Sequence, residues 1–134
     1  MRIAPELLDR IVGHALADAP DECCGVVVTR GGVAEQVRPL ENLAASPLGF
    51  EVDGLTLHRL LTEVEDAGLE LGAIYHSHTR SAPTPSQTDV NFAANWPGVE
   101  WLIVGTAGPQ PEVRSFLIED GVVREVDVET PAAP

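Results

Sequence analysis

The sequence predicts a single α/β domain in which helices pack against one mixed β-sheet. Three features support this prediction: an opening segment with apolar residues at helical spacing, a series of short apolar segments bounded by glycine turns, and two further helical segments between them. The 134 residues fit one domain and can bury a substantial core without disulfides. Because the 44% of apolar residues include few aromatics, we expect a core made mainly of Val, Leu, Ile and Ala.

The first half of the chain contains the opening helix and a β-hairpin. Apolar residues between Ile3 and Ala17 fall on one stripe, which predicts an amphipathic helix that ends before Pro20. Gly31-Gly32 lies between two apolar segments, as in a tight hairpin turn. The elements predicted up to residue 67 are strands at Gly25–Arg30 and Val33–Leu40, a loop from Asn42 to Gly49, a short strand at Phe50–Val52, and a helix from Leu55 to Ala67 with Asp53 as its N-cap.

The second half is predicted to consist of strands and one short helix. A buried strand at Leu71–Tyr75 leads into a loop that Pro83 and Pro85 keep out of regular structure. The elements predicted after this loop are a helix over Thr88–Ala94, a buried strand at Trp101–Gly105, and a closing hairpin of Val113–Ile118 and Val122–Val128 around Asp120-Gly121. We expect residues 1–129 to form the domain and residues 130–134 to be a disordered tail.

The net charge of −13 argues against nucleic acid or an anionic membrane as a partner, because both require a basic face. No apolar run approaches the roughly 18–20 residues that span a bilayer. No basic segment followed by an apolar one opens the chain as a secretion signal would. We therefore expect a cytoplasmic protein.

The two cysteines are neighbours in the sequence, which suits neither an ordinary intrachain disulfide nor a C-x-x-C metal site. Residues that enter a strand alternate between its faces, so we expect at most one thiol to be deeply buried. Cys24 is then a small core residue, and Cys23 lies nearer the wall of the candidate site. His14 and His58 fall on the predicted helices and are expected to be ordinary helix histidines, not ligands.

Two other histidines, His76 and His78, come at the end of the predicted strand. Residues two apart in a strand project from the same face, with Cα atoms about 6.6 Å apart. Their imidazoles could each bring a nitrogen to about 2.0–2.1 Å from one Zn²⁺. Asp89 falls in the first turn of the next helix, three residues after the predicted N-cap Ser86. Two His and one Asp would leave the fourth zinc position open, as catalytic sites do.

Simpler interpretations of these residues stay open at this point. Ser86-x-x-Asp89 is also a variant of the helix capping box, and a cap alone would explain both residues. His76 and His78 could be ordinary histidines at the end of a strand. Two His and one carboxylate also form the facial triad of non-haem iron oxygenases.

The spacing of these residues resembles the motif of the JAMM (MPN+) zinc metallopeptidases. The match is His76-x-His78, seven residues, Ser86, two residues and Asp89, without gap or substitution. Asp21-Glu22-Cys23-Cys24-Gly25 resembles the bacterial form of the family, in which a Glu precedes a Cys-Gly that enters a strand. The resemblance extends from the first helix to about Val128. It implies the family's cytidine-deaminase-like fold, a mixed sheet flanked by helices.

The resemblance also implies roles for these residues. One zinc ion per chain would be held by His76, His78 and Asp89, with Glu22 as the general base and Ser86 as a hydrogen-bond donor to the oxyanion. Glu22 can act at this distance in sequence if its strand and the histidine strand are neighbours in the sheet. Arg80, in the loop between the ligands, either contacts an acidic or carboxylate group of the substrate or is a solvated loop residue.

The implied activity is hydrolysis of an amide or isopeptide bond at the C-terminus of a ubiquitin-like or sulfur-carrier protein that ends in Gly-Gly. Release of cysteine from a carrier adduct is one such reaction. In the iron oxygenase alternative, Glu22 and Ser86 would have no role. A non-catalytic scaffold of the same fold is a further alternative, although here every ligand is present. The sequence does not determine the oligomeric state, so a homodimer stays open.

Overall fold

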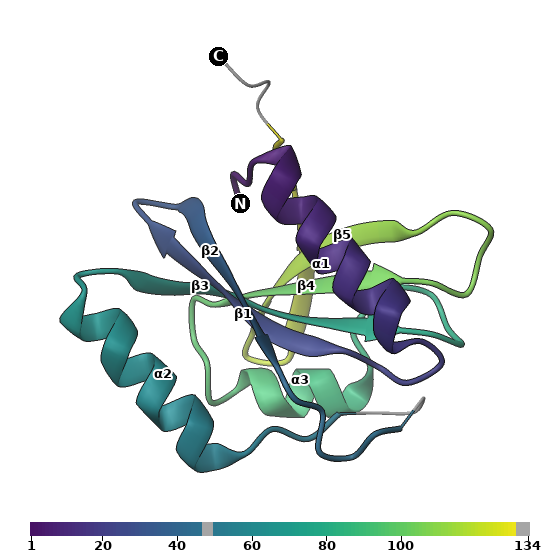
Figure 1. Ribbon diagram of the computed structural model, residues 1–134, viewed down its shortest axis with the longest axis horizontal. Coiled ribbons are helices and arrows are strands. Elements are labelled where there is room, and N and C mark those ends of the chain that lie inside the picture. The colour runs from purple at the N-terminus through teal and green to yellow at the C-terminus, as the bar shows by residue number, and fades with distance from the viewer. Residues whose placement is uncertain (47–49, 131–134) are drawn as a thin grey trace.

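A six-stranded mixed sheet with the strand order β2-β1-β3-β4-β5-β6 runs through the centre of the structure (Figure 1). β3 and β4 are parallel, and the other neighbouring pairs are antiparallel. The computed structural model describes residues 1–46 and 50–130, so the tail expected at 130–134 lies outside the described residues except for Thr130. The elements are α1 (Pro5–Asp18), β1 (Cys24–Arg30), β2 (Val33–Leu40), α2 (Gly54–Asp66), β3 (Glu70–His78), α3 (Gln87–Ala93), β4 (Glu100–Gly105), β5 (Glu112–Glu119) and β6 (Val122–Val126).

Helices cover both faces of this sheet. α1 packs on one face, and α2 and α3 lie on the opposite side (Figure 1). Neighbouring residues of the central strands therefore alternate between two hydrophobic cores, as the period of a strand requires. Val27, Tyr75 and Leu102 belong to the core under α1, whereas Val26 and Ile74 belong to the other core. This arrangement confirms the predicted α/β fold. Within the described residues, no helix combines the length and apolar character that a bilayer crossing requires.

The two adjacent cysteines are both buried, so the prediction of at most one buried thiol is wrong. Cys23 belongs to the core under α1, whereas Cys24 lines an apolar cavity on the α2–α3 side. The two thiols also lie on the opposite faces of the sheet from those predicted. Cys24, not Cys23, is on the face of the candidate site, because it lies opposite His76 in the sheet and shares its face. Burial raises the pKa of Cys23 to about 11 and that of Cys24 to about 12. Neither thiol is therefore a reactive nucleophile near neutral pH.

The turn and cap predictions are confirmed. Gly31-Gly32 connects β1 to β2 with φ angles of 57° and 81°, the left-handed conformation that both central residues of a type I′ turn require. Asp120-Gly121 connects β5 to β6 with φ angles of 52° and 76°. Asp53 caps α2 by accepting a hydrogen bond from the N–H of Thr56 at 3.1 Å.

α1 begins at Pro5 and ends at Asp18, close to the predicted bounds. Ile11 and Ala15, one turn apart, are fully buried against the sheet. Leu16 was predicted on the same stripe, but it is 52% exposed. It lies about 100° further round the helix than Ala15, beyond the part of α1 that faces the sheet.

No strand forms at Phe50–Val52, where one was predicted. This segment pairs with a neighbouring loop instead of the sheet. The N–H of Leu43 donates to the carbonyl of Glu51 at 2.8 Å, and the N–H of Glu51 donates to Oδ1 of Asn42 at 3.0 Å. The Asn42 side chain therefore takes the hydrogen bond that a neighbouring strand would otherwise accept.

Gly25 cannot be enlarged without disturbing the sheet. It lies opposite Tyr75 in the pairing of β1 with β3, and a Cβ atom added there would lie 2.3 Å from Cε1 of Tyr75. The Tyr75 hydroxyl is 2.7 Å from Nδ1 of His14, so the buried ring cannot move aside without losing that hydrogen bond. We expect Gly25→Ala to lower the free energy of unfolding by about 1–3 kcal/mol, measured by urea denaturation.

Gly13→Ala is the matched control for this measurement. Gly13 lies inside α1, and apart from its chain neighbours and the nearby backbone of α1 no atom lies within 4 Å of the Cβ that alanine would add. We expect this variant to be more stable than the wild type by up to about 1 kcal/mol, because alanine favours helices over glycine. A Gly25→Ala protein with wild-type stability would contradict the close packing of Tyr75.

Candidate metal centre

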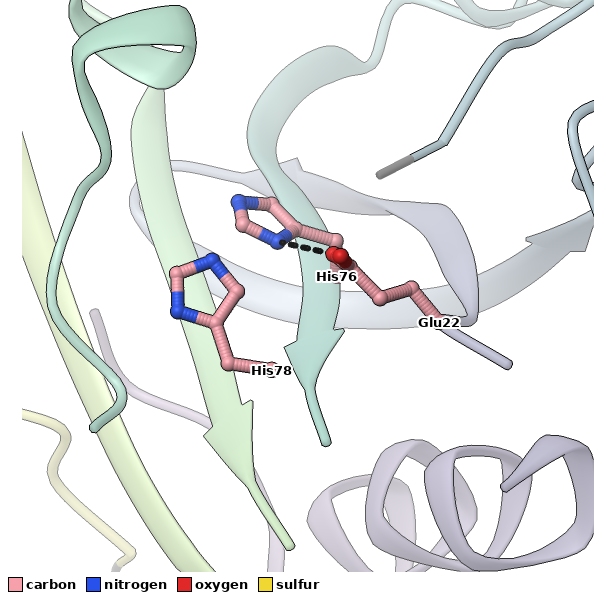
Figure 2. Close-up of side chains that lie close together, drawn as sticks. All are labelled: Glu22, His76 and His78. Atoms are coloured by element: carbon pink, nitrogen blue, oxygen red, sulfur yellow. Dashed lines mark ion pairs between the residues drawn. The ribbon is translucent and has the colours of Figure 1, made fainter. Parts of the chain in front are cut away.

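Two histidines at the C-terminal end of β3 form the centre of the site. β3 continues through His78, so both residues belong to the strand and, being two apart, share one face. His76 is 0% and His78 8% exposed, and their ring centroids are 5.0 Å apart. Figure 2 shows the two imidazoles side by side. The prediction that they project from the same face of one strand is confirmed.

The loop after β3 orients the imidazole of His78. Its Nδ1 lies 2.9 Å from the carbonyl oxygen of Ala82. A carbonyl can only accept a hydrogen bond, so Nδ1 carries the proton and donates it. In the neutral ring, Nε2 then keeps its lone pair, and it lies 3.6 Å from Oδ2 of Asp89. A nitrogen held in this way is suited to bind a metal ion.

Asp89 reaches both histidines from the first turn of α3. Its Oδ1 lies 3.2 Å from Nε2 of His76. The complete capping box is also present: Oγ of Ser86 accepts from the N–H of Asp89 at 3.2 Å, and Oδ2 of Asp89 accepts from the N–H of Ser86 at 2.8 Å. The cap and the site are therefore not alternatives, because the cap is what turns the Asp89 carboxylate toward the imidazoles.

Glu22 joins this cluster from the chain just before β1. The antiparallel pairing of β1 with β3 sets Cys24 opposite His76, which confirms that the Glu22 segment and the histidine strand are neighbours. Glu22 faces His76 (Figure 2): its Oε1 lies 3.7 Å from Nδ1 of His76, and the Glu22 side chain is buried. His76 therefore has one carboxylate beside each ring nitrogen, Glu22 at Nδ1 and Asp89 at Nε2.

The backbone of Glu22 is fixed by the loop that follows β2. Its N–H donates to the carbonyl of Ser46 at 2.9 Å, and its carbonyl accepts from Nδ2 of Asn42 at 2.8 Å. The next residue, Cys23, donates its N–H to Oγ of Ser77 at 2.8 Å. These three hydrogen bonds hold Glu22 at the cluster even though it belongs to no helix or strand.

The charges in the cluster favour a cation between the carboxylates. Burial lowers the pKa of His76, but Asp89 and Glu22 outweigh this effect and raise it to about 9. Burial likewise raises the pKa of Asp89, but the two histidines and the N–H of Ser86 hold it well below its usual range. The site therefore stabilises positive charge on His76 and negative charge on Asp89, and a cluster that favours separated charges in this way suits a divalent cation.

The geometry of His76 fits a metal ion. Both of its ring nitrogens are buried, and neither makes a hydrogen bond of acceptable geometry with any described residue. Glu22, His76 and His78 each offer a ligand atom within 4.8 Å of the others, and Asp89 contacts both imidazoles. Imidazole nitrogen and carboxylate oxygen are the donors that zinc accepts in catalytic sites. Either carboxylate is close enough to serve as the third ligand.

A cavity of about 300 Å³ opens onto this cluster. Glu22, His78 and Asp89 line it, together with Ser86 and Arg80. The hydroxyl of Ser86 uses a lone pair to cap α3, so its proton is free to be donated into the cavity. A substrate in this cavity would therefore meet the cluster, a hydroxyl donor and a cationic side chain.

Phe50 is a site residue that the sequence analysis missed. Its ring stacks on His76, with ring centroids 4.9 Å apart and planes at 29°. Phe92 of α3 also lines the cavity, and it is half exposed. No pattern in the sequence connects Phe50 with the histidines, because the contact arises from the path of the loop that precedes α2. The Phe50 ring covers one face of the His76 imidazole, and both rings form part of the cavity wall.

Known proteins resemble this chain over nearly its whole length. Residues 4–119 match the family described as prokaryotic homologs of the JAB domain. The CysO-cysteine peptidase of Mycobacterium tuberculosis is 36% identical over 129 residues, covering 94% of this chain and 88% of that protein. A Thermus thermophilus protein described as "Probable TtuB-protein conjugate cleaving protease" is 40% identical over 116 residues, covering 86% of this chain and 74% of that protein.

A solved structure extends the agreement to three dimensions. Protein DSY2949 from Desulfitobacterium hafniense superposes with a TM-score of 0.82 and 28% sequence identity, covering 98% of this chain and 93% of that one. The family match and the two relatives therefore agree with the shared fold. The chain therefore belongs to the JAB/MPN (JAMM) family in its prokaryotic branch, and it is a hydrolase.

Proposed function

We propose that this protein is a zinc-dependent metallopeptidase that hydrolyses an amide or isopeptide bond at the C-terminus of a ubiquitin-like or sulfur-carrier protein. One observation carries the proposal: two buried imidazoles and two carboxylates meet beside a cavity that is open to solvent. His76, His78 and Asp89 would hold the metal. Zn²⁺ bound there would lower the pKa of a water molecule to about 7 and polarise the scissile carbonyl.

The protein's own side chains would then move the protons. Glu22 accepts a proton from the attacking water, whose oxygen bonds to the carbonyl carbon of the substrate. Glu22 returns this proton to the amine nitrogen as the carbon–nitrogen bond breaks, which leaves a carboxylic acid on the carrier and a free amine. The acid then gives up the second proton of the water to the amine, so that the products are a carboxylate and an ammonium group. Ser86 donates a hydrogen bond to the oxygen on which negative charge develops.

The size of the cavity supports a narrow substrate. Its volume of about 300 Å³ lies at the lower end of the range for ligand sites. Phe50 and Phe92 line it as well and restrict its width. A tail ending in Gly-Gly has no side chains next to the scissile bond, so it can enter where a bulkier segment would not. The name of one relative refers to a CysO–cysteine adduct and the name of the other to a TtuB–protein conjugate, and cleavage of such conjugates supports the proposed reaction class.

The two carboxylates beside His76 argue against the two alternatives. An iron oxygenase with a facial triad needs one carboxylate, whereas here both Glu22 and Asp89 lie beside His76. A non-catalytic scaffold would gain no stability from two buried carboxylates beside one histidine, because taking such polar groups out of water costs free energy unless a partner compensates them.

Metal content tests the proposed centre directly. We expect about one zinc per chain by elemental analysis of protein purified without added metal. His78→Ala should lose most of this zinc, because it removes one of three protein ligands. His58→Ala is the matched control, since His58 is exposed on α2 and should leave the zinc content unchanged. Bound iron together with oxygen consumption would contradict the proposal, as would a protein that takes up no zinc.

A further inference from the structure

Arg80 occupies a distinctive place at the metal site. It lies on the loop between β3 and α3 and lines the cavity that opens onto the metal cluster. Its side chain is exposed and makes no ion pair or hydrogen bond with any part of the chain that the structure describes. Arg30, Arg38 and Arg114, by contrast, are each paired with a glutamate. The charge of Arg80 is therefore available to a ligand.

The backbone of the loop is anchored on both sides of Arg80. Before it, Oγ1 of Thr79 donates to the carbonyl of Pro20 at 2.9 Å. After it, the carbonyl of Ala82 accepts from Nδ1 of His78, and Pro83 packs closely against Gly105. A Cβ atom at Gly105 would lie 2.9 Å from Cδ of Pro83. The backbone that carries Arg80 is thus fixed relative to the metal ligand His78, which lowers the entropy cost of an ion pair made there.

Arg80 also supplies positive charge to the wall of the substrate cavity. Among the described residues that line this cavity, the other charged groups are the carboxylates of Glu22 and Asp89, and Arg80 is the only Arg or Lys. The two carboxylates offset the charge of a divalent metal ion. An anionic group on the substrate would therefore be attracted chiefly by Arg80, within a protein whose net charge is −13.

The two kinds of leaving amine differ in this respect. When the amine belongs to a free amino acid, its nitrogen and its α-carboxylate sit on the same carbon, so the carboxylate carbon is only about 2.5 Å from the scissile nitrogen. When the amine is a lysine side chain of a protein, no carboxylate of that lysine's backbone is free. A guanidinium is the side chain best suited to bind a carboxylate through two parallel hydrogen bonds.

We propose that Arg80 binds the α-carboxylate of the departing amino acid and so directs this protein toward carrier–amino acid adducts and away from lysine isopeptides. This inference rests on the proposed hydrolase function and specifies its substrate class. Arg80 would act in substrate binding and orientation, while Glu22 would carry out the proton transfers. The ion pair forms with the bound substrate, so its loss should appear mainly in KM.

Three synthetic peptides test this role on the zinc-loaded protein. All three have the same acyl segment, whose last two residues are Gly-Gly. The final glycine is joined to the amino group of serine with a free carboxylate, to the amino group of serine amide, or to Nε of a lysine blocked at both ends. Serine replaces cysteine so that no thiol competes for the metal. We expect the wild type to cleave the free-carboxylate peptide with a kcat/KM about 10–100-fold above that of the other two, the range expected for a charged hydrogen bond.

Arg80→Gln should abolish this preference. It should lower kcat/KM for the free-carboxylate peptide about 10–100-fold and change the other two less than 3-fold. Arg80→Lys should recover part of the loss, because it restores the charge but not the paired hydrogen bonds. Arg124→Gln is the matched control for net charge: Arg124 lies on β6, the edge strand three places from β3. It should leave the preference intact.

A wild type without the preference, or an equal loss on all three peptides in Arg80→Gln, would overturn the role of Arg80. If no peptide is cleaved, the proposed hydrolytic substrate is wrong. The role of Arg80 is then tested by the affinity of the protein for the uncleaved peptides. Calorimetry on the Glu22→Gln protein measures the affinity for each uncleaved peptide. The free-carboxylate peptide should bind this protein about 10–100-fold more tightly than its amide, and Arg80→Gln should remove the difference. Equal affinities for the two peptides would refute the proposal independently of turnover.

Discussion

Replacement of Glu22 by glutamine is expected to lower the rate of hydrolysis by about 10²–10⁴-fold while the zinc content stays near one per chain. Glutamine keeps the shape of the side chain but cannot accept the proton of the attacking water. The backbone of residue 22 should not move, because Ser46 and Asn42 hold its N–H and carbonyl groups. Steady-state kinetics and elemental analysis of the same preparation measure the two quantities.

The proximity of Glu22 to His76 makes the zinc measurement as important as the rate. Both Glu22 and Asp89 lie beside His76, so either carboxylate is near enough to be a ligand. Loss of zinc in Glu22→Gln would show that Glu22 binds the metal and that its assignment as the base is wrong. Asp21→Asn is the control, because it removes the same charge one residue away and should leave both rate and zinc unchanged.

Ser86→Ala is expected to lower kcat by about 10²–10³-fold, because the hydrogen bond to the oxyanion exists only in the transition state. The same change removes the acceptor of the Asp89 N–H and should cost about 0.5–2 kcal/mol of stability. The reciprocal hydrogen bond, from the Ser86 N–H to Oδ2 of Asp89, uses the backbone and survives in the variant. Asp89 should therefore keep its orientation, and zinc should stay bound.

Asp53→Ala separates the loss of a cap from the loss of a catalytic donor. Asp53 caps α2 through the N–H and hydroxyl of Thr56, at 3.1 and 2.7 Å. The Asp53→Ala protein should lose about as much stability as Ser86→Ala in a urea titration, and its kcat in the folded state should be unchanged. Full activity of zinc-loaded Ser86→Ala would leave Ser86 as a helix cap alone and remove it from the mechanism.

Local patterns in the sequence were sufficient for the parts of the site that lie close together along the chain. The strand period alone sets His76 and His78 on one face. The capping box needs only Ser86 and Asp89, three residues apart, and α3 begins where this spacing predicts. Gly31-Gly32 likewise determines its hairpin, because two successive positive φ angles suit glycine best.

Tertiary structure decided the contacts between distant segments. The register that sets Cys24 opposite His76 brings Glu22 to the imidazole, and no spacing in the sequence encodes that register. The burial of both cysteines follows from helices on both faces of the sheet, and the stacking of Phe50 on His76 follows from a loop held by Asn42. Sequence periodicity fixes which face a residue takes within its own element. Which elements meet at that face depends on packing across the whole fold. The position of Glu22, the second carboxylate of the site, was therefore determined only by the tertiary structure.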